Sequence, residues 1–280
     1  MSGDQTLCIS VVIPSLNQGK FIETAIKSVI DQNYPETELI IIDGGSSDNT
    51  VETIKKFENS ITFFVSKPDN GQSDALNKGF EKASGDIFCW LNSDDFFLPG
   101  AFQIVSELFN KNSDISVVYG NWLTVEENGE TVEKCRALPA RNPSLVHGNM
   151  DAYNQSMFWR RKAHSGFKFD TNLSRLMDND FIIYLLKNSG PENFFRTDEY
   201  LGAFRIHESQ KTPLYEDKVR IKESAYLEKK YGFAPRGSMN YIFSNLKYRI
   251  FQLYHTIKLH GITAATEKIK NGLKRGRKII

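Results

Sequence analysis

Four short apolar runs near the start of the chain place the strongest constraint on its fold. They span residues 8–13, 39–42, 61–65 and 87–91, and a polar cluster follows each of them. Between the runs, apolar residues recur at helical spacing, for example over residues 21–30. Strands that alternate with helices predict an α/β fold with a mostly parallel, doubly wound sheet and helices on both of its faces.

The polar clusters should gather at one edge of this sheet, because the carboxyl ends of parallel strands meet there and commonly form the ligand site. The fourth cluster is the most informative, since Asp94 and Asp95 directly follow a buried strand. Adjacent carboxylates repel each other and favour a cation beside them. Oxygen ligands indicate Mg²⁺ or Mn²⁺ rather than zinc. The alternative is a solvated turn in which Asp95 caps the next helix.

The pattern changes after residue 110. A β-hairpin is predicted around Asn128-Gly129, and a helix opens at Asp178. Further strand patterns occur at residues 117–119, 156–160 and 201–207, and further helical patterns at residues 213–230 and 239–260. We therefore expect one α/β domain over residues 1–212, followed by a helical, basic extension over residues 213–280.

The charge of the chain is concentrated in this extension. The whole chain has a formal net charge of +1, whereas residues 241–280 contain nine Lys and Arg against one acid, Glu267. This tail therefore carries +8 and leaves −7 for the first 240 residues. The apolar face of residues 243–257 indicates either a helix packed on the domain or an amphipathic helix on an anionic membrane. We favour packing for residues 243–257 and membrane contact for residues 268–278.

The sequence lacks the motifs that are typical of several classes of protein. No Gly-x-Gly-x-x-Gly follows the first strand, no Gly-x-x-x-x-Gly-Lys-Ser/Thr is present, and there is no Ser-His-Asp elbow. The tail has no recognised nucleic-acid-binding fold, so nucleic acid is not an expected partner. Three cysteines lack metal-ligand spacing, and neither a signal-peptide pattern nor an apolar run of about 18 residues occurs. We expect a cytoplasmic protein whose tail can reach the inner face of the plasma membrane.

Four motifs, in this order and at this spacing, carry a resemblance to a known family. They are Val12-Ile13-Pro14-Ser15-Leu16-Asn17, Ile41-Ile42-Asp43-Gly44-Gly45-Ser46-Ser47-Asp48, Pro68-Asp69-Asn70-Gly71-Gln72-Ser73-Asp74-Ala75 and Leu91-Asn92-Ser93-Asp94-Asp95. Over residues 8–210 the chain resembles the family 2 glycosyltransferases with the GT-A fold. The resemblance implies an inverting hexosyl- or N-acetylhexosaminyltransferase that moves a sugar from a nucleotide-diphosphate donor to an acceptor hydroxyl. Glycans and lipid-linked sugars of surface polysaccharides or glycolipids are the usual acceptors.

The resemblance also implies donor-binding roles for residues at the ends of the strands. These residues are Pro14, Ser15, Asn17, Asp43, Asp69, Gln72, Asp74, Asn92, Ser93 and Asp94. Asp43 would accept a hydrogen bond from the base, commonly uracil, so a UDP-sugar is the expected donor. The structural alternatives are a turn-forming Asp43 and a helix-capping Asp69.

The resemblance also implies which residues bind the metal and which residue is the catalytic base. Asn92-Ser93-Asp94 stands where the family has Asp-x-Asp, so one carboxylate is replaced by an amide that offers only a carbonyl oxygen. The expected ligands of Mn²⁺ or Mg²⁺ are Asp94, Asp95 and His207. Asp178 matches the catalytic base of the family, although it could instead cap its helix. Gln155-Ser156 is a weaker candidate for contact with the acceptor.

Two other functions stay open at this stage. A non-catalytic sugar-nucleotide-binding or scaffold protein of the same fold is indicated only by Asn92. A sugar nucleotidyltransferase shares the sheet topology, but it would need a Gly-rich loop with Arg and Lys after the first strand. This chain has Pro-Ser-Leu-Asn-Gln-Gly-Lys at that place.

Overall fold

The first four strands form the parallel sheet that the sequence predicts. A computed structural model describes residues 6–138, 154–210, 217–234 and, apart from 241, 244–245, 248–249, 251–252 and 256, residues 238–258. Its first half contains β1 (Ile9–Ser15), α1 (Ile22–Ile30), β2 (Thr37–Asp43), α2 (Thr50–Lys55), η1 (Glu58–Ser60), β3 (Phe63–Ser66), α3 (Gln72–Phe80) and β4 (Ile87–Trp90). The strands lie parallel in the order β3-β2-β1-β4. The polar clusters at their carboxyl ends therefore do share one edge.

The second half of the sheet is mixed rather than parallel. It contains β5 (Phe96–Phe97), α4 (Ala101–Lys111), β6 (Val117–Val125), β7 (Thr131–Cys135), η3 (Asn154–Ser156), β8 (Met157–Arg160), α5 (Arg161–His164), α6 (Met177–Ser189), η4 (Pro191–Asn193) and β9 (Phe194–Arg205). β8 runs antiparallel to both β4 and β6, β5 runs antiparallel to β9, and only β6 and β9 pair in parallel. The described strands thus follow the order β3-β2-β1-β4-β8-β6-β9-β5, with β7 paired to β6.

The predicted hairpin is confirmed. β6 and β7 pair antiparallel, with a register shift at Thr124/Val125. In the connecting turn Gly129 has a φ of 90°, a left-handed conformation that favours glycine. Antiparallel neighbours can be joined by such a short turn, whereas parallel neighbours need a crossover. Of the described strands, only β6 and β7 are joined in this way; the other antiparallel pairs, β4 with β8, β6 with β8 and β5 with β9, join strands that lie far apart in the chain.

An aromatic cluster fixes α6 over β4 and β8. The ring of Phe181 lies 4.8 Å from the ring of Trp159 and 5.7 Å from that of Trp90, measured between ring centroids. All three side chains are fully buried, and each such ring pair is worth about 0.5–1.5 kcal/mol beyond the area it buries. This packing holds the first turn of α6 near the carboxyl end of β4.

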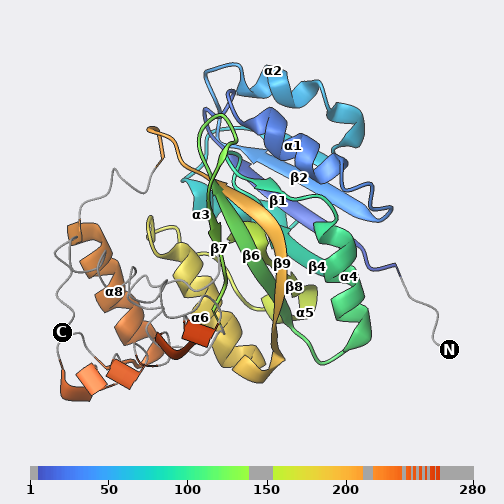
Figure 1. Cartoon of the computed structure of the whole chain (residues 1–280). Coiled ribbons are helices and arrows are strands. Elements are labelled where there is room, and N and C mark those ends of the chain that lie inside the picture. The colour runs from blue at the N-terminus through green and yellow to red at the C-terminus, as the bar shows by residue number, and fades with distance from the viewer. Residues whose placement is uncertain are drawn as a thin grey trace.

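The helix α8 (Asp217–Tyr231) belongs to the same packed unit, and Figure 1 shows it beside α6. The Lys230 ammonium lies 2.8 Å from both carboxylate oxygens of Asp180, and the Tyr231 hydroxyl donates to the same carboxylate at 2.7 Å. Leu227 is fully buried. The first helix of the predicted extension is therefore attached to the α/β domain by a buried ion pair and apolar contacts.

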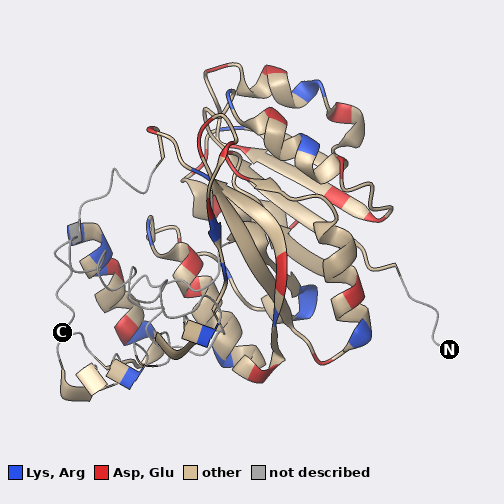
Figure 2. Ribbon diagram, in the orientation of Figure 1, with Lys and Arg blue, Asp and Glu red and all other residues tan. Residues whose placement is uncertain are grey.

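The helical residues after α8 do not pack as expected. Their apolar side chains are exposed, namely Met239, Ile242, Phe243, Leu246, Ile250, Leu253, Tyr254 and Ile257. The predicted packing of residues 243–257 on the domain is therefore wrong for the described part of this segment. Figure 2 shows basic residues on α8 and on the helical pieces after it. The predicted membrane-contacting cluster, residues 268–278, lies outside the described residues.

Within the described part of the chain, no helix is both long enough and apolar enough to cross a bilayer.

Candidate active site

The turn after β2 is built around the carboxylate of Asp43. This side chain is fully buried. One of its oxygens accepts hydrogen bonds from the backbone N–H of Gly45 at 3.1 Å and of Ser46 at 2.9 Å. The same oxygen accepts from the Ser66 hydroxyl at 2.6 Å, and the Ser46 hydroxyl donates to the other oxygen. The geometry favours the turn-forming role of Asp43, since its carboxylate is fully buried and accepts hydrogen bonds from Gly45, Ser46 and Ser66.

Asn17 joins the turns after β1 and β2. It has a φ of 52°, a left-handed conformation that Asn tolerates better than most residues. Its backbone N–H donates to the Ser46 hydroxyl at 2.7 Å, and its side-chain oxygen accepts from the Ser47 N–H at 2.8 Å. Pro14 and Ser15 are buried beside it, and the Ser15 hydroxyl has no partner among the described residues. A ligand or an ordered water can supply the missing hydrogen-bond partner of such a buried hydroxyl.

The carboxylates of Asp69 and Asp74 form hydrogen bonds with residues at the start of α3. Asp69 is half-buried and accepts from the Gly71 N–H at 2.8 Å. Asp74 accepts from the Asn70 N–H at 3.0 Å and pairs with Lys78 at 2.9 Å, and these contacts lower its pKa. A Cβ atom added at Gly44 would lie 3.0 Å from Asp69. The turn after β2 and the turn after β3 are therefore in close contact, which a side chain larger than that of Gly44 would disturb.

A chain of hydrogen bonds runs from α3 through the aspartate cluster to β9. The Gln72 amide donates to the side-chain oxygen of Asn92 at 2.8 Å, and the Asn92 amide donates to Asp95 at 3.2 Å. Asp95 in turn accepts from the backbone N–H of Arg205 at 3.0 Å. A carboxylate at position 92 could not donate to Asp95. This gives a structural reason for asparagine at the place of the first aspartate of the motif, a reason that the sequence did not indicate.

Asp95 faces inward in this chain. It is 1% exposed, and its burial, with the charge of Asp94, raises its pKa well above the ordinary value. Its neighbour Asp94 is half-buried and reaches the edge of the site. The two adjacent carboxylates therefore differ in accessibility, and the structure favours Asp94 over Asp95 as a metal ligand.

His207 lies directly against Asp94. Its Nε2 is 3.0 Å from Oδ2 of Asp94, its Nδ1 is 2.8 Å from the Ser209 hydroxyl, and its ring lies on Phe21 at 4.5 Å between centroids. The Arg205 guanidinium donates to the backbone oxygen of Asp94 at 2.9 Å, which holds the turn in place. The structure thus brings together two of the three predicted metal ligands.

Asp94 and His207 fit a divalent cation that is shared with a substrate. Among the described residues, no cluster of three or more His, Cys, Asp or Glu side chains could hold a metal by itself. One carboxylate and one imidazole suit Mn²⁺, and Mg²⁺ is commonly bound through one or two carboxylates together with phosphate oxygens and waters. A bound diphosphate would therefore have to complete the coordination.

Asp178 stands at the second position of α6, and this helix begins beside the start of α3. The Ser73 hydroxyl of α3 lies 3.4 Å from the Leu173 carbonyl oxygen and 3.2 Å from the Met177 sulfur. Asp178 is half-buried and accepts from the Asn179 N–H at 2.8 Å. Burial, assisted by the charge of Glu223, raises its pKa to about 6. A carboxylate with this pKa is ionised at neutral pH and still has substantial basicity.

The two aspartates of the first turn of α6 have different surroundings. Asp180 is fully buried in its ion pair with Lys230, which leaves it no access to the edge of the sheet. Asp178 is instead influenced by two opposite charges, since Glu223 raises its pKa and Arg175 lowers it. The sequence could not separate the environments of these residues beyond their spacing, whereas the packing of α8 separates them clearly.

Gln155 is a further polar residue of interest next to β9. It is fully buried, and neither its amide nitrogen nor its amide oxygen has a partner among the described residues. A Cβ atom added at Gly202 would lie 2.0 Å from the Gln155 carbonyl oxygen, so η3 packs directly on the backbone of β9. The weaker prediction of acceptor contact for Gln155-Ser156 is left untested by these contacts.

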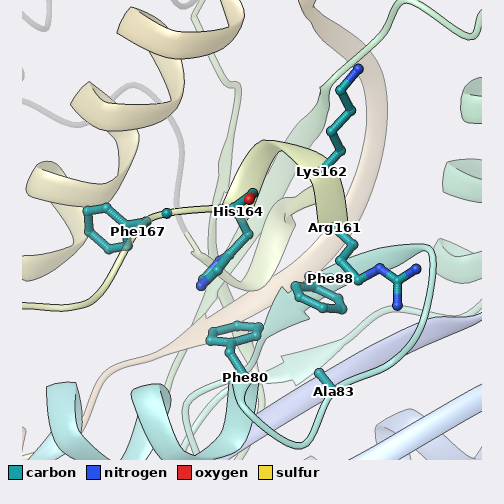
Figure 3. A pocket seen from close by; sticks show the side chains of 9 residues that line it. Phe80, Ala83, Phe88, Arg161, Lys162, His164 and Phe167 are labelled. Atoms are coloured by element: carbon teal, nitrogen blue, oxygen red, sulfur yellow. The ribbon is translucent and has the colours of Figure 1, made fainter.

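A hollow of about 480 Å³ lies away from the aspartate cluster, between the end of α3, Phe88 of β4 and residues 161–167. Figure 3 shows the ring of His164 over that of Phe80, with Lys162 pointing away from the hollow. Trp159 donates to Nδ1 of His164 at 3.3 Å, and burial lowers the pKa of this imidazole to about 4. The half-buried His164 is therefore neutral at neutral pH, and no carboxylate of the described residues lines this hollow.

The sequence model of glycosyl transferase family 2 matches residues 10–183, which is more than half of the chain. The chain belongs to glycosyl transferase family 2. This family membership confirms the resemblance on which the residue assignments rest. The matched segment includes the strand-end clusters and Asp178, and it ends before β9 and α8.

Curated relatives agree with the family. The chain is 30% identical to an uncharacterised glycosyltransferase of Nostoc sp. over 212 residues, which are 71% of this chain and 65% of that protein. It is 27% identical to chondroitin synthase of Pasteurella multocida over 63% of this chain and 18% of that protein. It is 33% identical to the GalNAc(5)-diNAcBac-PP-undecaprenol beta-1,3-glucosyltransferase of Campylobacter jejuni, over 45% of this chain and 41% of that protein. The chain spans less than two thirds of the length of each of them.

Solved structures confirm the fold class. S. aureus TarS in complex with UDP-GlcNAc superposes with a TM-score of 0.60 at 14% identity, over 98% of this chain and 93% of that chain. A mannosyltransferase from Pyrobaculum calidifontis, in complex with GDP-Man and Mn²⁺, gives 0.61 at 13% identity, over 98% and 82%. The mixed, curled α/β sheet of the family 2 chain is thus that of GT-A glycosyltransferases.

Proposed function

We propose that this chain is an inverting glycosyltransferase that moves a hexosyl or N-acetylhexosaminyl group from a nucleotide-diphosphate sugar to an acceptor hydroxyl. The observation that carries the proposal is the meeting of Asp94 and His207 at the carboxyl edge of the sheet. Asp178 opens a neighbouring helix and combines partial access with a raised pKa. A metal-binding pair and a separate base are the two parts that such a displacement requires.

In this proposal Asp94 and His207 would hold Mn²⁺ or Mg²⁺ together with the donor diphosphate, and the bound ion would supply positive charge to offset the negative charge on the departing diphosphate. Asp95 and Arg205 act behind this pair, because their contacts fix the turn that presents Asp94. The presence of Mn²⁺ in the complex of the Pyrobaculum mannosyltransferase supports the choice of cation.

Asp178 is proposed to remove the proton from the acceptor hydroxyl as that oxygen attacks the anomeric carbon. The attack comes from the face opposite to the leaving diphosphate, so the configuration at the anomeric carbon inverts. Proton removal by a positioned base typically contributes about 10²–10⁴ in rate. The base must be ionised to act, and the positive end of the α6 dipole favours the ionised form.

The other strand-end residues are proposed to bind the donor. Pro14, Ser15 and Asn17 border the nucleoside, while Asp69, Gln72 and Asp74 line the ribose and sugar region. Asn92 and Ser93 continue this surface towards the metal. We keep UDP as the proposed nucleotide, with Asp43 as the base-facing residue, since the oxygen that accepts from the Ser46 hydroxyl can accept a second hydrogen bond.

The proposed acceptor is a glycan or a lipid-linked sugar of a surface polysaccharide or glycolipid. The names of the Pasteurella and Campylobacter relatives, which refer to chondroitin and to an undecaprenol-linked glycan, support this class. The exposed apolar side chains of residues 239–258, followed by the basic tail, suit the surface of an anionic membrane. We therefore propose that the protein works at the cytoplasmic face of the plasma membrane.

A donor screen tests the proposal directly. Nucleotide sugars are added with Mn²⁺, and thermal stabilisation is measured first, since a ligand at about 100 times its Kd adds roughly 2.7 kcal/mol. Slow release of free sugar from the stabilising donor then shows turnover without acceptor. Tighter binding of GDP than of UDP would reject the assigned nucleotide. Binding without any hydrolysis or transfer would instead support the scaffold alternative, for which Asn92 no longer provides a reason.

A further inference from the structure

Glu223 of α8 is a buried carboxylate that serves a neighbouring helix. It is 6% exposed. One carboxylate oxygen accepts from the backbone N–H and the hydroxyl of Ser174, both at 2.8 Å. The other accepts from the N–H of Arg175 at 3.0 Å and from the N–H of Leu176 at 2.8 Å. Both oxygens are therefore committed to the three residues that lead into α6.

These bonds hold the backbone just before α6. The N-cap residue of α6 is Leu176, whose side chain cannot accept a hydrogen bond, and no side-chain cap is present. Glu223 accepts from the N–H groups of residues 174–176, which precede the first turn of the helix. Its negative charge is favourable near the amino end of α6.

We propose that Glu223 is a positioning residue for the catalytic base, holding the segment 174–176 so that Asp178 points its carboxylate at the acceptor hydroxyl. This inference rests on the proposed function. Asp178 follows the held segment by two residues, so a shift of that segment moves the base itself. A misplacement of about 1 Å at a reacting group can cost roughly 100-fold in rate.

The source of this contact is outside the part of the chain that the family model matches. That match ends at residue 183, whereas Glu223 is on α8 (Asp217–Tyr231). The helix is anchored independently at its other end by Lys230 and Tyr231, which bind Asp180. The helix α8 thus contacts residues both before and after the base, and Glu223 makes the contact on the side that leads into α6.

The charge of Glu223 also bears on the protonation of the base. The charged groups that face Asp178 are Glu223 from α8 and Arg175 from the segment before α6. After burial, which is the largest cause, the negative charge of Glu223 raises the pKa of Asp178, and the positive charge of Arg175 lowers it. Removing the charge of Glu223 should therefore lower the pKa of Asp178.

The test is the pH–rate profile of Glu223→Gln with donor, acceptor and metal at saturation. The glutamine keeps the size of the side chain but loses the charge and one of the two accepting oxygens. We expect kcat to fall by roughly 10- to 100-fold, the KM for the donor to stay the same, and the acid limb of the profile to move to lower pH. Glu223→Asp keeps the charge, so its acid limb should stay near that of the wild type.

Lys230→Met is the matched control for loss of α8 packing, because it breaks the other attachment of α8 and leaves segment 174–176 untouched. If Glu223 were only structural, both variants would lose thermal stability alike, and the residual activity of each would keep the wild-type acid limb. That result would overturn the proposal. A shifted limb in Glu223→Gln together with an unshifted limb in Lys230→Met supports it.

Two variants distinguish a wrong assignment of the catalytic base from a wrong role for Glu223. If Asp178→Asn transfers sugar at the wild-type rate, the base is assigned wrongly, and the role of Glu223 falls with it. If Asp178→Asn is inactive while Glu223→Gln keeps the wild-type kcat and acid limb, the base is right and only the positioning role is wrong. Both variants should be folded in these assays, which thermal unfolding of each checks.

Discussion

Nε2 of His207 lies 3.0 Å from Oδ2 of Asp94, although 113 positions separate the two residues in the chain. The contact closes the carboxyl edge of β4 against the end of β9. It also places an imidazole and a carboxylate where one cation could bind both. The proposed metal dependence follows from this pair.

Donor turnover should require Mn²⁺ or Mg²⁺ and stop on treatment with EDTA. Asp94→Ala removes the accessible carboxylate, so we expect a loss of at least about 100-fold in turnover together with weaker donor binding. His207→Ala should weaken the affinity for Mn²⁺ measured by calorimetry. Asp31→Ala, at an exposed position after α1, is the control and should change neither quantity. Full activity in EDTA would mean that side chains alone stabilise the diphosphate.

Restoring the aspartate of the family motif should harm this chain. Asn92→Asp replaces an amide that donates to buried Asp95 with a second carboxylate, which leaves Asp95 without that donor. A lost hydrogen bond to a buried group costs about 1–3 kcal/mol. Because the added carboxylate would lie beside that of Asp95, we expect its ionised form to be disfavoured in the folded state, so the cost should be present at neutral pH and disappear as pH falls below about 4. Thermal unfolding from pH 8 to pH 4 measures this, and higher stability of the variant at pH 8 would contradict it.

Asp178→Asn should abolish transfer without unfolding the protein. The amide cannot take a proton, so kcat should fall by about 10²–10⁴, while donor affinity stays the same. Because the carboxylate has a pKa of about 6 in the folded protein, above its ordinary value of 3.8, its ionisation opposes folding above pH 6. The variant should therefore be at least as stable as the wild type at pH 7.5. A wild-type kcat/KM that did not fall below about pH 6 would argue against Asp178 as the base.

The neighbouring aspartate should show the opposite pattern. Lys230→Met removes the cation from the fully buried Asp180 carboxylate and leaves it, among the described residues, with the Tyr231 hydroxyl as its hydrogen-bonding side chain. Removing one partner of a buried pair is strongly destabilising, and we expect a loss of up to about 3 kcal/mol, since Lys230 is partly exposed. Denaturant unfolding measures the loss. Transfer per folded molecule should change far less than in Asp178→Asn, and an equal loss would show that α8 docking itself controls catalysis.

Membrane contact should depend on the exposed apolar side chains after α8. The double variant Phe243→Asp and Leu246→Asp should bind more weakly to vesicles that contain anionic lipid, and donor hydrolysis should be unchanged. Removal of residues 268–280 should weaken binding further, since each basic residue near such a surface is worth about 1 kcal/mol and salt screens the attraction. Val132→Asp, at an exposed apolar position on β7, is the control. Equal vesicle binding by all variants would mean that these side chains do not contact the membrane.

The sequence by itself determined the strands, their alternation with helices in the first half, and the residues that end each strand. Apolar periodicity and turn chemistry are local properties, so they can be read without knowing which segments meet. Asp94 was found in this way, and the rule that parallel strands share a carboxyl edge predicted that the strand-end clusters converge. Asp178 was recognised by its place at a helix start together with the family resemblance. The mixed pairing of β5, β8 and β9 was missed, because strand direction depends on partners that the pattern does not name.

Only the tertiary structure decided what each carboxylate contacts. Asp94 and Asp95 are equivalent in the sequence, yet one reaches His207 and the other is buried behind Asn92 and Arg205. Asp178 and Asp180 share one helical turn, yet α8 pairs with only one of them. The physical reason is that the accessibility and the pKa of a carboxylate depend on burial and on neighbouring charges. Those neighbours come from segments far along the chain, and packing alone selects them.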